Sequence, residues 1–195
     1  MYQEQTFDLK AVDGLSQKQI EEHLKLYRGY VENVNILTEK IEEYDKDTVA
    51  NKSALSELRR RLGFEFNGMR LHELYFEALK GPQIDSVAPT LQQRLAEQYG
   101  SPDTWWGEFS QMGMMRGVGW VILYHDPKAK RFHNVWVSDH ELGHLAGCDV
   151  ILAMDVWEHA FLPDYLPSQR KDYIDAFFKN LNWNILEQRI ISSNF

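Results

Sequence analysis

Cysteine is almost absent from this 195-residue sequence, which contains only Cys148. A single cysteine excludes an intramolecular disulfide framework and any cysteine-rich zinc site. Cys148 stands just before the apolar residues Val150 and Ile151. We therefore expect it to pack as a small apolar side chain rather than to act in catalysis.

Long hydrophobic runs are missing as well. No stretch is long and apolar enough to cross a bilayer, and the first ten residues, MYQEQTFDLK, carry charges where a signal peptide has an apolar core.

Basic residues are fewer than acidic ones, 21 against 29, so the formal net charge is −8. Such a surface attracts neither phosphate backbones nor anionic lipids. We therefore expect a cytoplasmic protein without nucleic-acid or membrane partners.

The first half of the chain has the pattern of two long helices. Apolar residues at helical spacing predict one helix that follows an N-cap at Ser16 and a second from about Ser53 to Lys80. The composition of residues 81–90 is typical of a connector, and it begins with Gly81-Pro82. We place a domain boundary there, between a helical hairpin domain of residues 1–81 and a second domain of residues 91–195.

The second half mixes helices and strands. Helices are predicted over residues 91–99, 101–111, 157–161 and 171–190, and strands over residues 120–126, 131–137 and 149–154. A short charged turn joins the first two strands, which is the pattern of an antiparallel hairpin. The predicted fold is α+β: a long helical hairpin followed by a domain in which helices pack on a three-stranded antiparallel sheet. A site is expected between the two halves.

The stretch DVWEHAF, residues 155–161, carries the strongest chemical signal. It places the Asp155 carboxylate and the His159 imidazole four residues apart, directly after the apolar run 150–154. In a helix these positions face the same way, and if Asp155 ends a strand, the following turn still brings His159 back beside it. One carboxylate and one imidazole suit iron, manganese or zinc, whereas calcium and magnesium prefer oxygen ligands alone.

The same stretch resembles the metal-binding signature of the iron/manganese superoxide dismutases, and the predicted order of elements resembles the fold of that family over essentially the whole chain. The resemblance implies an enzyme that converts superoxide into dioxygen and hydrogen peroxide. It also implies one iron or manganese ion per subunit, held by three histidines and one aspartate. One of these histidines comes from each helix of the hairpin.

The two remaining ligands follow from local matches to the family. His72 lies in FNGMRLHELYF, residues 66–76, and His23 lies in SQKQIEEHLKLYRGYV, residues 16–31. The implied ligand set is therefore His23, His72, Asp155 and His159. In the family the first histidine usually precedes the tyrosine by eight residues, whereas His23 precedes Tyr30 by seven. Without a gap, the ligand position falls on Glu22.

Further residues match the surroundings of the family's metal. Tyr30 matches the active-site tyrosine, and His140 stands where some members have a histidine bonded to the solvent on the metal. These two are the implied catalytic proton network, with His144 as the nearest competitor of His140. His125 and His133 are expected to be solvated. Aromatic and basic matches complete the set: Trp120 and Trp157 in the aromatic wall, and Lys25 and Arg170 in the substrate funnel.

The resemblance also implies a homodimer. In the family the signature glutamate, here Glu158, reaches the ligand histidine of the other subunit, which here is the partner subunit's His159. A tetramer remains open. A histidine–tyrosine pair that the family places at this interface is replaced by Leu26 and Leu162, so the mouth of the site is expected to be more apolar.

Three functions are compatible with these residues. The first is an active iron- or manganese-dependent superoxide dismutase. The second is a relative that binds metal but has lost or altered its redox activity, which the shorter spacing in the first helix and the missing polar pair suggest. The third is a helical interaction module whose histidines are core residues, which requires that four site residues coincide by chance.

Overall fold

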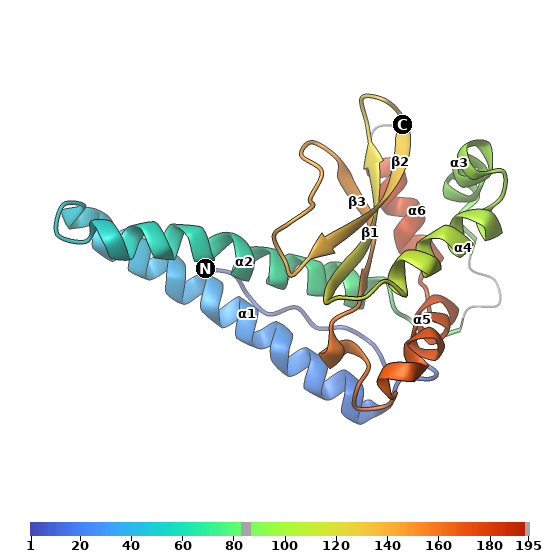
Figure 1. Cartoon of the computed structure of the whole chain (residues 1–195), viewed down its shortest axis with the longest axis horizontal. Helices are drawn as coiled ribbons and strands as arrows, with labels where there is room; N and C mark the ends of the chain where they lie inside the picture. Colours follow the sequence, from blue (N-terminus) through green and yellow to red (C-terminus); the bar gives the residue numbers. More distant parts are fainter. Residues whose placement is uncertain (83–86, 194–195) are drawn as a thin grey trace.

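Two long helices cross the molecule as an antiparallel hairpin, and a small sheet with shorter helices lies at the hairpin's open end (Figure 1). The computed structural model describes residues 1–82 and 87–193. Helix α1 spans Gln17–Tyr44 and α2 spans Lys52–Glu77, joined through a short 3-10 turn at Asp45–Asp47. Residues 83–86 of the predicted connector lie outside the described part of the chain.

Helix α1 begins and packs as its sequence predicts. The Ser16 side chain accepts a hydrogen bond from the Gln19 backbone N–H, which satisfies one of the free donors of the first turn. A regular three- and four-residue spacing then turns one stripe of the helix toward α2 and the core. This buried stripe consists of Gln19, Ile20, His23, Tyr27, Val31 and Val34.

The sheet has three antiparallel strands in the order β2-β1-β3, so β1 is the central strand. Strand β1 spans Gly119–Asp126, β2 spans Arg131–Ser138 and β3 spans Asp149–Asp155. Seven of the eight residues of β1 are buried because helices cover the sheet and strands pair with both of its edges. Strand β3 ends at Asp155, so the sheet delivers this carboxylate to the interior.

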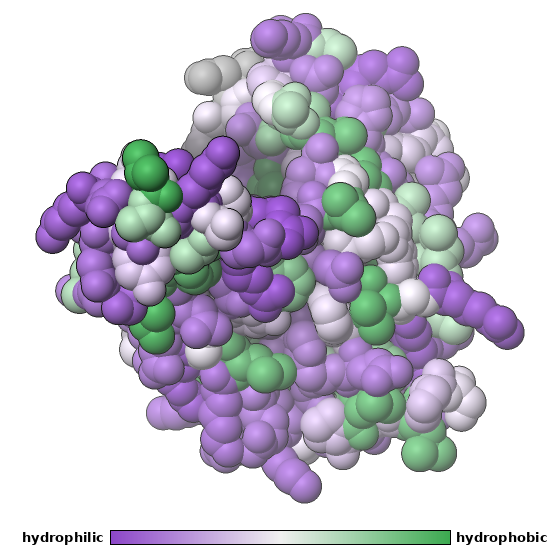
Figure 2. All heavy atoms as spheres, turned by 60° about the vertical axis from the view of Figure 1, so that its left-hand side comes forward, coloured by the Kyte–Doolittle hydropathy of each residue, from purple (hydrophilic) through white to green (hydrophobic). Residues whose placement is uncertain are grey.

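The remaining helices are α3 at Pro89–Tyr99, α4 at Pro102–Gly113, α5 at Arg170–Lys179 and α6 at Trp183–Ser192. The predicted α+β arrangement of helical hairpin and three-stranded antiparallel sheet is confirmed. The face of the molecule in Figure 2 is mostly hydrophilic, with separate hydrophobic patches. Within the described residues, no helix is both long and apolar enough to span a membrane.

Two predicted helices are wrong in extent. Residues 171–190 form two helices because the chain breaks at Asn180, whose side chain bonds to Asp13 and whose carbonyl accepts from the Lys80 N–H. The Asn182 N–H then donates to the Ala78 carbonyl. Residues 157–161 contain only a 3-10 turn at Glu158–Ala160, since the chain must fold back sharply after β3.

Candidate metal centre

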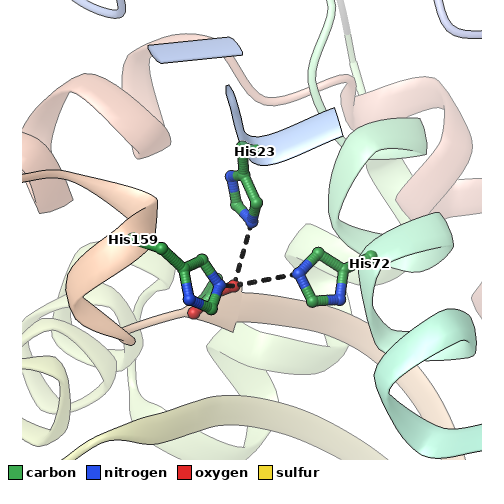
Figure 3. Close-up of side chains that lie close together, drawn as sticks. His23, His72 and His159 are labelled. Carbon is green, nitrogen blue, oxygen red and sulfur yellow. Dashed lines mark hydrogen bonds and ion pairs between the residues drawn. The ribbon is translucent and has the colours of Figure 1, made fainter. Parts of the chain in front are cut away.

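Four side chains from three separate parts of the chain meet between the hairpin and the sheet. His23 comes from α1, His72 from α2, Asp155 from the end of β3 and His159 from the turn that follows. Their potential ligand atoms all lie within 4.8 Å of one another. Figure 3 shows the three imidazoles pointing toward a single carboxylate oxygen. The structure therefore brings together all four residues expected as ligands.

The distances define a small cage around Asp155 Oδ2. The Nε2 atoms of His23 and His159 each lie 3.1 Å from this oxygen, and Nε2 of His72 lies 3.7 Å away. Asp155 and His72 are fully buried, His23 is almost so, and the His159 side chain keeps 22% of its surface exposed. His159 is therefore the most solvent-exposed of the four side chains.

His72 has the chemistry of a residue that can bind a cation. Its Nδ1 lies 2.6 Å from the Gly68 carbonyl oxygen, which can only accept, so Nδ1 carries the proton. The neutral ring then directs the lone pair of Nε2 into the cage, where this buried nitrogen has no hydrogen-bond partner. A buried polar atom without a partner is costly, and a metal ion removes that cost.

The protonation states within the cluster also suit the binding of a cation. Burial lowers the pKa values of His23 and His72, so both rings stay neutral and their lone pairs stay available. Burial alone would raise the pKa of Asp155, but its electrostatic interactions and hydrogen bonds with His159 and His23 hold it well below its usual value. Imidazoles and an ionised carboxylate are ligands that iron, manganese and zinc accept.

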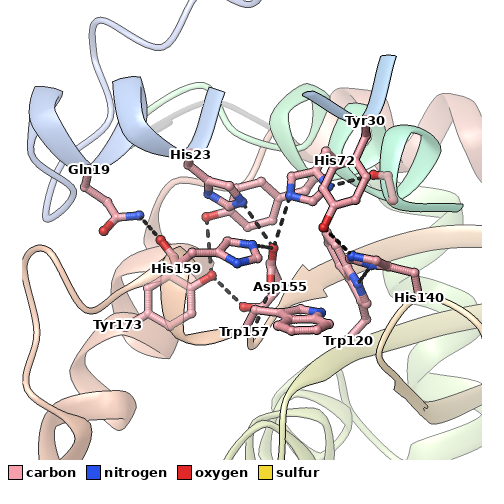
Figure 4. A network of polar contacts seen from close by, with 12 residues as sticks. Gln19, His23, Tyr30, His72, Trp120, His140, Asp155, Trp157, His159 and Tyr173 are labelled. Atoms are coloured by element: carbon pink, nitrogen blue, oxygen red, sulfur yellow. Dashed lines mark hydrogen bonds and ion pairs between the residues drawn. The ribbon is translucent and has the colours of Figure 1, made fainter. Parts of the chain in front are cut away.

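Neighbouring groups fix the segment that carries Asp155 and His159 (Figure 4). The Trp157 N–H donates to Asp155 Oδ1 at 2.8 Å, which leaves Oδ2 to the three imidazoles. The Tyr173 hydroxyl donates to the Asp155 carbonyl at 2.7 Å, and Gln19 Nε2 donates to the His159 carbonyl at 2.7 Å. Neither Gln19 nor Tyr173 was predicted from the sequence, although Gln19 lies one helical turn before His23 on the same face.

Beside the cage lies a chain of hydrogen bonds through Tyr30 and His140. Trp120 Nε1 donates to His140 Nδ1 at 2.9 Å, and His140 Nε2 lies 2.8 Å from the Tyr30 hydroxyl. Because the indole can only donate, Nδ1 of the neutral ring accepts and Nε2 carries the proton. Burial lowers the pKa of His140 to about 4, so the ring is neutral near pH 7. The Tyr30 oxygen thus accepts from His140 and keeps its own proton free to donate.

Aromatic rings line the cage as expected. The Trp157 ring stacks on those of His140 and His159, with centroids 5.2 and 5.7 Å apart, and Trp120 meets His72 edge-on at 5.1 Å. Such walls lower the local dielectric and strengthen the electrostatic interactions inside.

Three further residues considered in the sequence, Glu22, Lys25 and Arg170, lie outside the cage. Glu22 is exposed and pairs with Lys25 at 2.6 Å, so His23 rather than Glu22 faces the cluster. Lys25 lines a pocket of about 390 Å³ together with Tyr30 and Trp157. Arg170 is half-buried, and its Nη1 donates to the Gly117 carbonyl at 3.1 Å.

The prediction that His125 is solvated is wrong. This residue lies on the central strand β1 and is fully buried, and its Nδ1 is 2.5 Å from the Ser193 hydroxyl next to α6. His133, on the edge strand β2, is partly buried. His144 does not contact Tyr30 in place of His140, because its ring bonds to the Tyr124 hydroxyl and to the His140 carbonyl.

Gly68 leaves the space that Tyr30 occupies. A Cβ atom at Gly68 would lie 2.6 Å from the Tyr30 ring, whereas one at Gly63, in the same helix, would have as its nearest neighbour the Glu141 carboxylate at 3.9 Å. We expect Gly63→Ala to stabilise the protein by up to about 1 kcal/mol through helix propensity. Gly68→Ala should instead destabilise it by about 1–3 kcal/mol, because the core is overpacked. Urea unfolding of both variants tests this, and equal stabilisation by the two would contradict it.

Comparisons with known proteins agree with this geometry. Residues 87–189 match the C-terminal domain of the iron/manganese superoxide dismutases. The chain is 38% identical to an iron superoxide dismutase of Cupriavidus metallidurans over 174 residues, covering 87% of this chain and 85% of that protein. It is 32% identical to an iron superoxide dismutase of Aquifex pyrophilus, covering 91% and 85%. It is 34% identical to a manganese superoxide dismutase of Haloferax volcanii, covering 81% and 77%.

Proposed function

The chain belongs to the iron/manganese superoxide dismutase family, and we propose that His23, His72, Asp155 and His159 hold its single iron or manganese ion. The enzyme converts two superoxide anions and two protons into one dioxygen and one hydrogen peroxide. The bound ion supplies the change of oxidation state through which one superoxide loses an electron and the next gains it. The similarity to named enzymes favours this function over a relative with lost redox activity.

The remaining chemistry falls to the side chains beside the cage. Reduction of superoxide to hydrogen peroxide consumes two protons, and we propose that Tyr30 and His140 are the catalytic residues that deliver one of them. The hydrogen bond from His140 leaves the Tyr30 proton free, and Tyr30 also lines a surface pocket that we propose as the entry for a small anion. Lys25, on the rim of the same pocket, adds local positive charge to an acidic surface.

The observation that carries the proposal is the buried, unpartnered Nε2 of His72 in a cage with two further imidazoles and one ionised carboxylate. The test is to load the metal-free protein separately with iron and with manganese, and to measure metal content and superoxide consumption for each preparation. We expect one ion per chain and rapid dismutation with at least one metal. Stoichiometric loading without dismutation by either form would contradict the proposal. The ligands accept both ions, so this experiment also identifies the metal.

We further propose a homodimer in which Glu158 reaches the partner subunit's His159. Glu158 is exposed, and it stands beside the most solvent-exposed of the four proposed ligands. Leu26 and Leu162, in the places of the family's polar interface pair, are 41% and 40% exposed. A second copy of the chain would cover these apolar side chains, which supports an interface at the mouth of the site.

Replacing Glu158 by alanine should weaken this dimer. The carboxylate would lose a charge-assisted hydrogen bond across the interface, which is worth about 1.5–3 kcal/mol. We expect the dissociation constant from analytical ultracentrifugation to rise by at least about 10-fold. Glu108→Ala, which removes an exposed glutamate of α4, is the control. A wild-type protein that is monomeric at micromolar concentration with its metal retained would exclude the dimer.

A further inference from the structure

The loop between β2 and β3 is tightly folded around His140. The Ser138 N–H donates to the Leu142 carbonyl at 2.8 Å, and the Leu142 N–H donates back to the Ser138 carbonyl at 3.2 Å. Asp139 has a φ of 52° and Gly143 a φ of 118°, which are left-handed values that side chains disfavour. A loop with such a backbone needs contacts outside itself to keep a single conformation.

Two side chains supply these contacts at one atom, the carbonyl oxygen of His140. Asn67 Nδ2 of helix α2 donates to it at 2.7 Å, and His144 Nε2 lies 3.0 Å away. The His140 ring is held separately, by Trp120 on one nitrogen and Tyr30 on the other. The backbone and the ring of His140 are thus fixed by different partners. The proposed proton network involves only the partners of the ring.

The proton positions in this second set of contacts follow from chemistry. A carbonyl oxygen only accepts, so Nε2 of His144 carries the proton and donates. Nδ1 of the neutral ring must then accept, and the group 2.6 Å from it is the Tyr124 hydroxyl. Burial raises the pKa of Tyr124 to about 12, so this hydroxyl stays protonated and can donate. The donor direction therefore runs from Tyr124 through His144 to the backbone of His140.

The contacts that hold the ring and the carbonyl of His140 both originate from residues of strand β1. Trp120 and Tyr124 lie four residues apart on β1, so they face the same side of the sheet. Trp120 bonds to the ring of His140, while Tyr124 orients the residue that bonds to its carbonyl. The rigid central strand of the sheet thereby fixes His140 at two points, one of them through His144.

We propose that His144, oriented by Tyr124, is a positioning residue that sets the placement of His140 and, through it, of the Tyr30 hydroxyl. This inference rests on the proposed function of Tyr30 and His140. It assigns to His144 a role different from direct contact with the metal or substrate. His144 acts only by keeping the loop in the conformation that aligns His140 Nε2 with the Tyr30 oxygen.

Three variants test the inference in the metal-loaded full-length protein. His144→Leu removes both hydrogen bonds at similar volume, Tyr124→Phe removes one oxygen, and His144→Gln keeps a donor and an acceptor. We expect His144→Leu to lower turnover at saturating superoxide by about 10-fold at unchanged metal content, as loss of a supporting hydrogen bond does at metal sites. Tyr124→Phe should have a smaller effect, and His144→Gln should restore most of the turnover. His133→Leu, on the neighbouring strand, is the matched control.

A second measurement is independent of dismutation. In the diamagnetic zinc-loaded protein, solvent exchange of the Trp120 indole N–H reports how firmly His140 stays in place. We expect exchange at least about 10-fold faster in His144→Leu, with the indole of Trp105, which bonds to Asn134, as the internal reference.

The outcomes separate the two proposals. Wild-type exchange of the Trp120 indole in His144→Leu would overturn the positioning role, whatever the activity. If the Trp120 indole exchanges faster in His144→Leu but the metal-loaded wild-type protein does not dismutate superoxide, the positioning role is supported and the proposed function is contradicted. If His144→Leu fails to fold, Tyr124→Phe decides by the same exchange measurement, and an unchanged rate there overturns the inference.

Discussion

Asp155→Asn is expected to abolish stable metal binding while the protein remains folded. The Trp157 N–H donates to Asp155 Oδ1 and will keep the amide oxygen of the new side chain in that place. The amide NH₂ group then takes the position of Oδ2, where three imidazole nitrogens converge. An NH₂ group donates to those lone pairs instead of binding a cation. The substitution thus removes the anionic ligand of the four, and its two N–H donors can occupy the lone pairs of two of the three imidazoles.

The size of the effect follows from this double loss. Losing a group that merely supports a ligand costs about 10–100-fold in metal affinity, so the loss of Asp155 should exceed that range. Metal content after dialysis and the rise in melting temperature on adding iron or manganese are the measurements. The wild-type protein gains about 4 kcal/mol at a free metal concentration of 1,000 times the dissociation constant, and the variant should gain almost nothing.

Asp149→Asn is the matched control for this experiment. Asp149 begins the same strand that Asp155 ends, it is exposed, and it accepts a hydrogen bond from the Ser193 hydroxyl that an amide oxygen can also accept. This variant should retain its metal. If Asp155→Asn binds iron or manganese as tightly as Asp149→Asn, the four residues are not the metal ligands.

The sequence was informative where chemistry depends on spacing. Asp155 and His159 could be paired because a strand end or a helix brings residues four apart together. His23 and Tyr30 are seven residues apart, about two helical turns, so an unbroken helix turns both toward the same centre. This explains why His23 faces the cage although its spacing differs from that usual in the family, and why Glu22 faces solvent.

The sequence was uninformative where placement depends on tertiary contacts. The bond from Gln19 to the His159 carbonyl joins residues 140 positions apart, and no local pattern indicates such a pair. The burial of His125 depends on strand order, because the central strand is covered on both faces. The break between α5 and α6 depends on hydrogen bonds to Asp13 and to residues 78–80. Each of these features requires the folded chain.

Tyr30→Phe should lower turnover at saturating superoxide by about 100-fold and leave the metal in place, because it removes a proton donor, together with the acceptor of the His140 N–H, but no metal ligand. The ring keeps its contacts with His72 and Phe64, whose centroids lie 5.1 and 6.3 Å away. Only the hydroxyl that accepts from His140 is lost. Capture of superoxide does not require that proton, so the second-order rate constant at low superoxide should fall much less. Stopped-flow measurements at high and low superoxide separate the two constants.

Tyr27→Phe provides the comparison because Tyr27 lies about one turn earlier on the same helix and is also buried. Its hydroxyl accepts from the Gln5 N–H and donates to Glu73, away from the cage. Loss of this hydroxyl should lower stability by about 1 kcal/mol without changing turnover. If both variants lose turnover equally, the effect at Tyr30 comes from disturbed packing of α1. A loss confined to Tyr30→Phe assigns proton delivery to the one hydroxyl that meets His140.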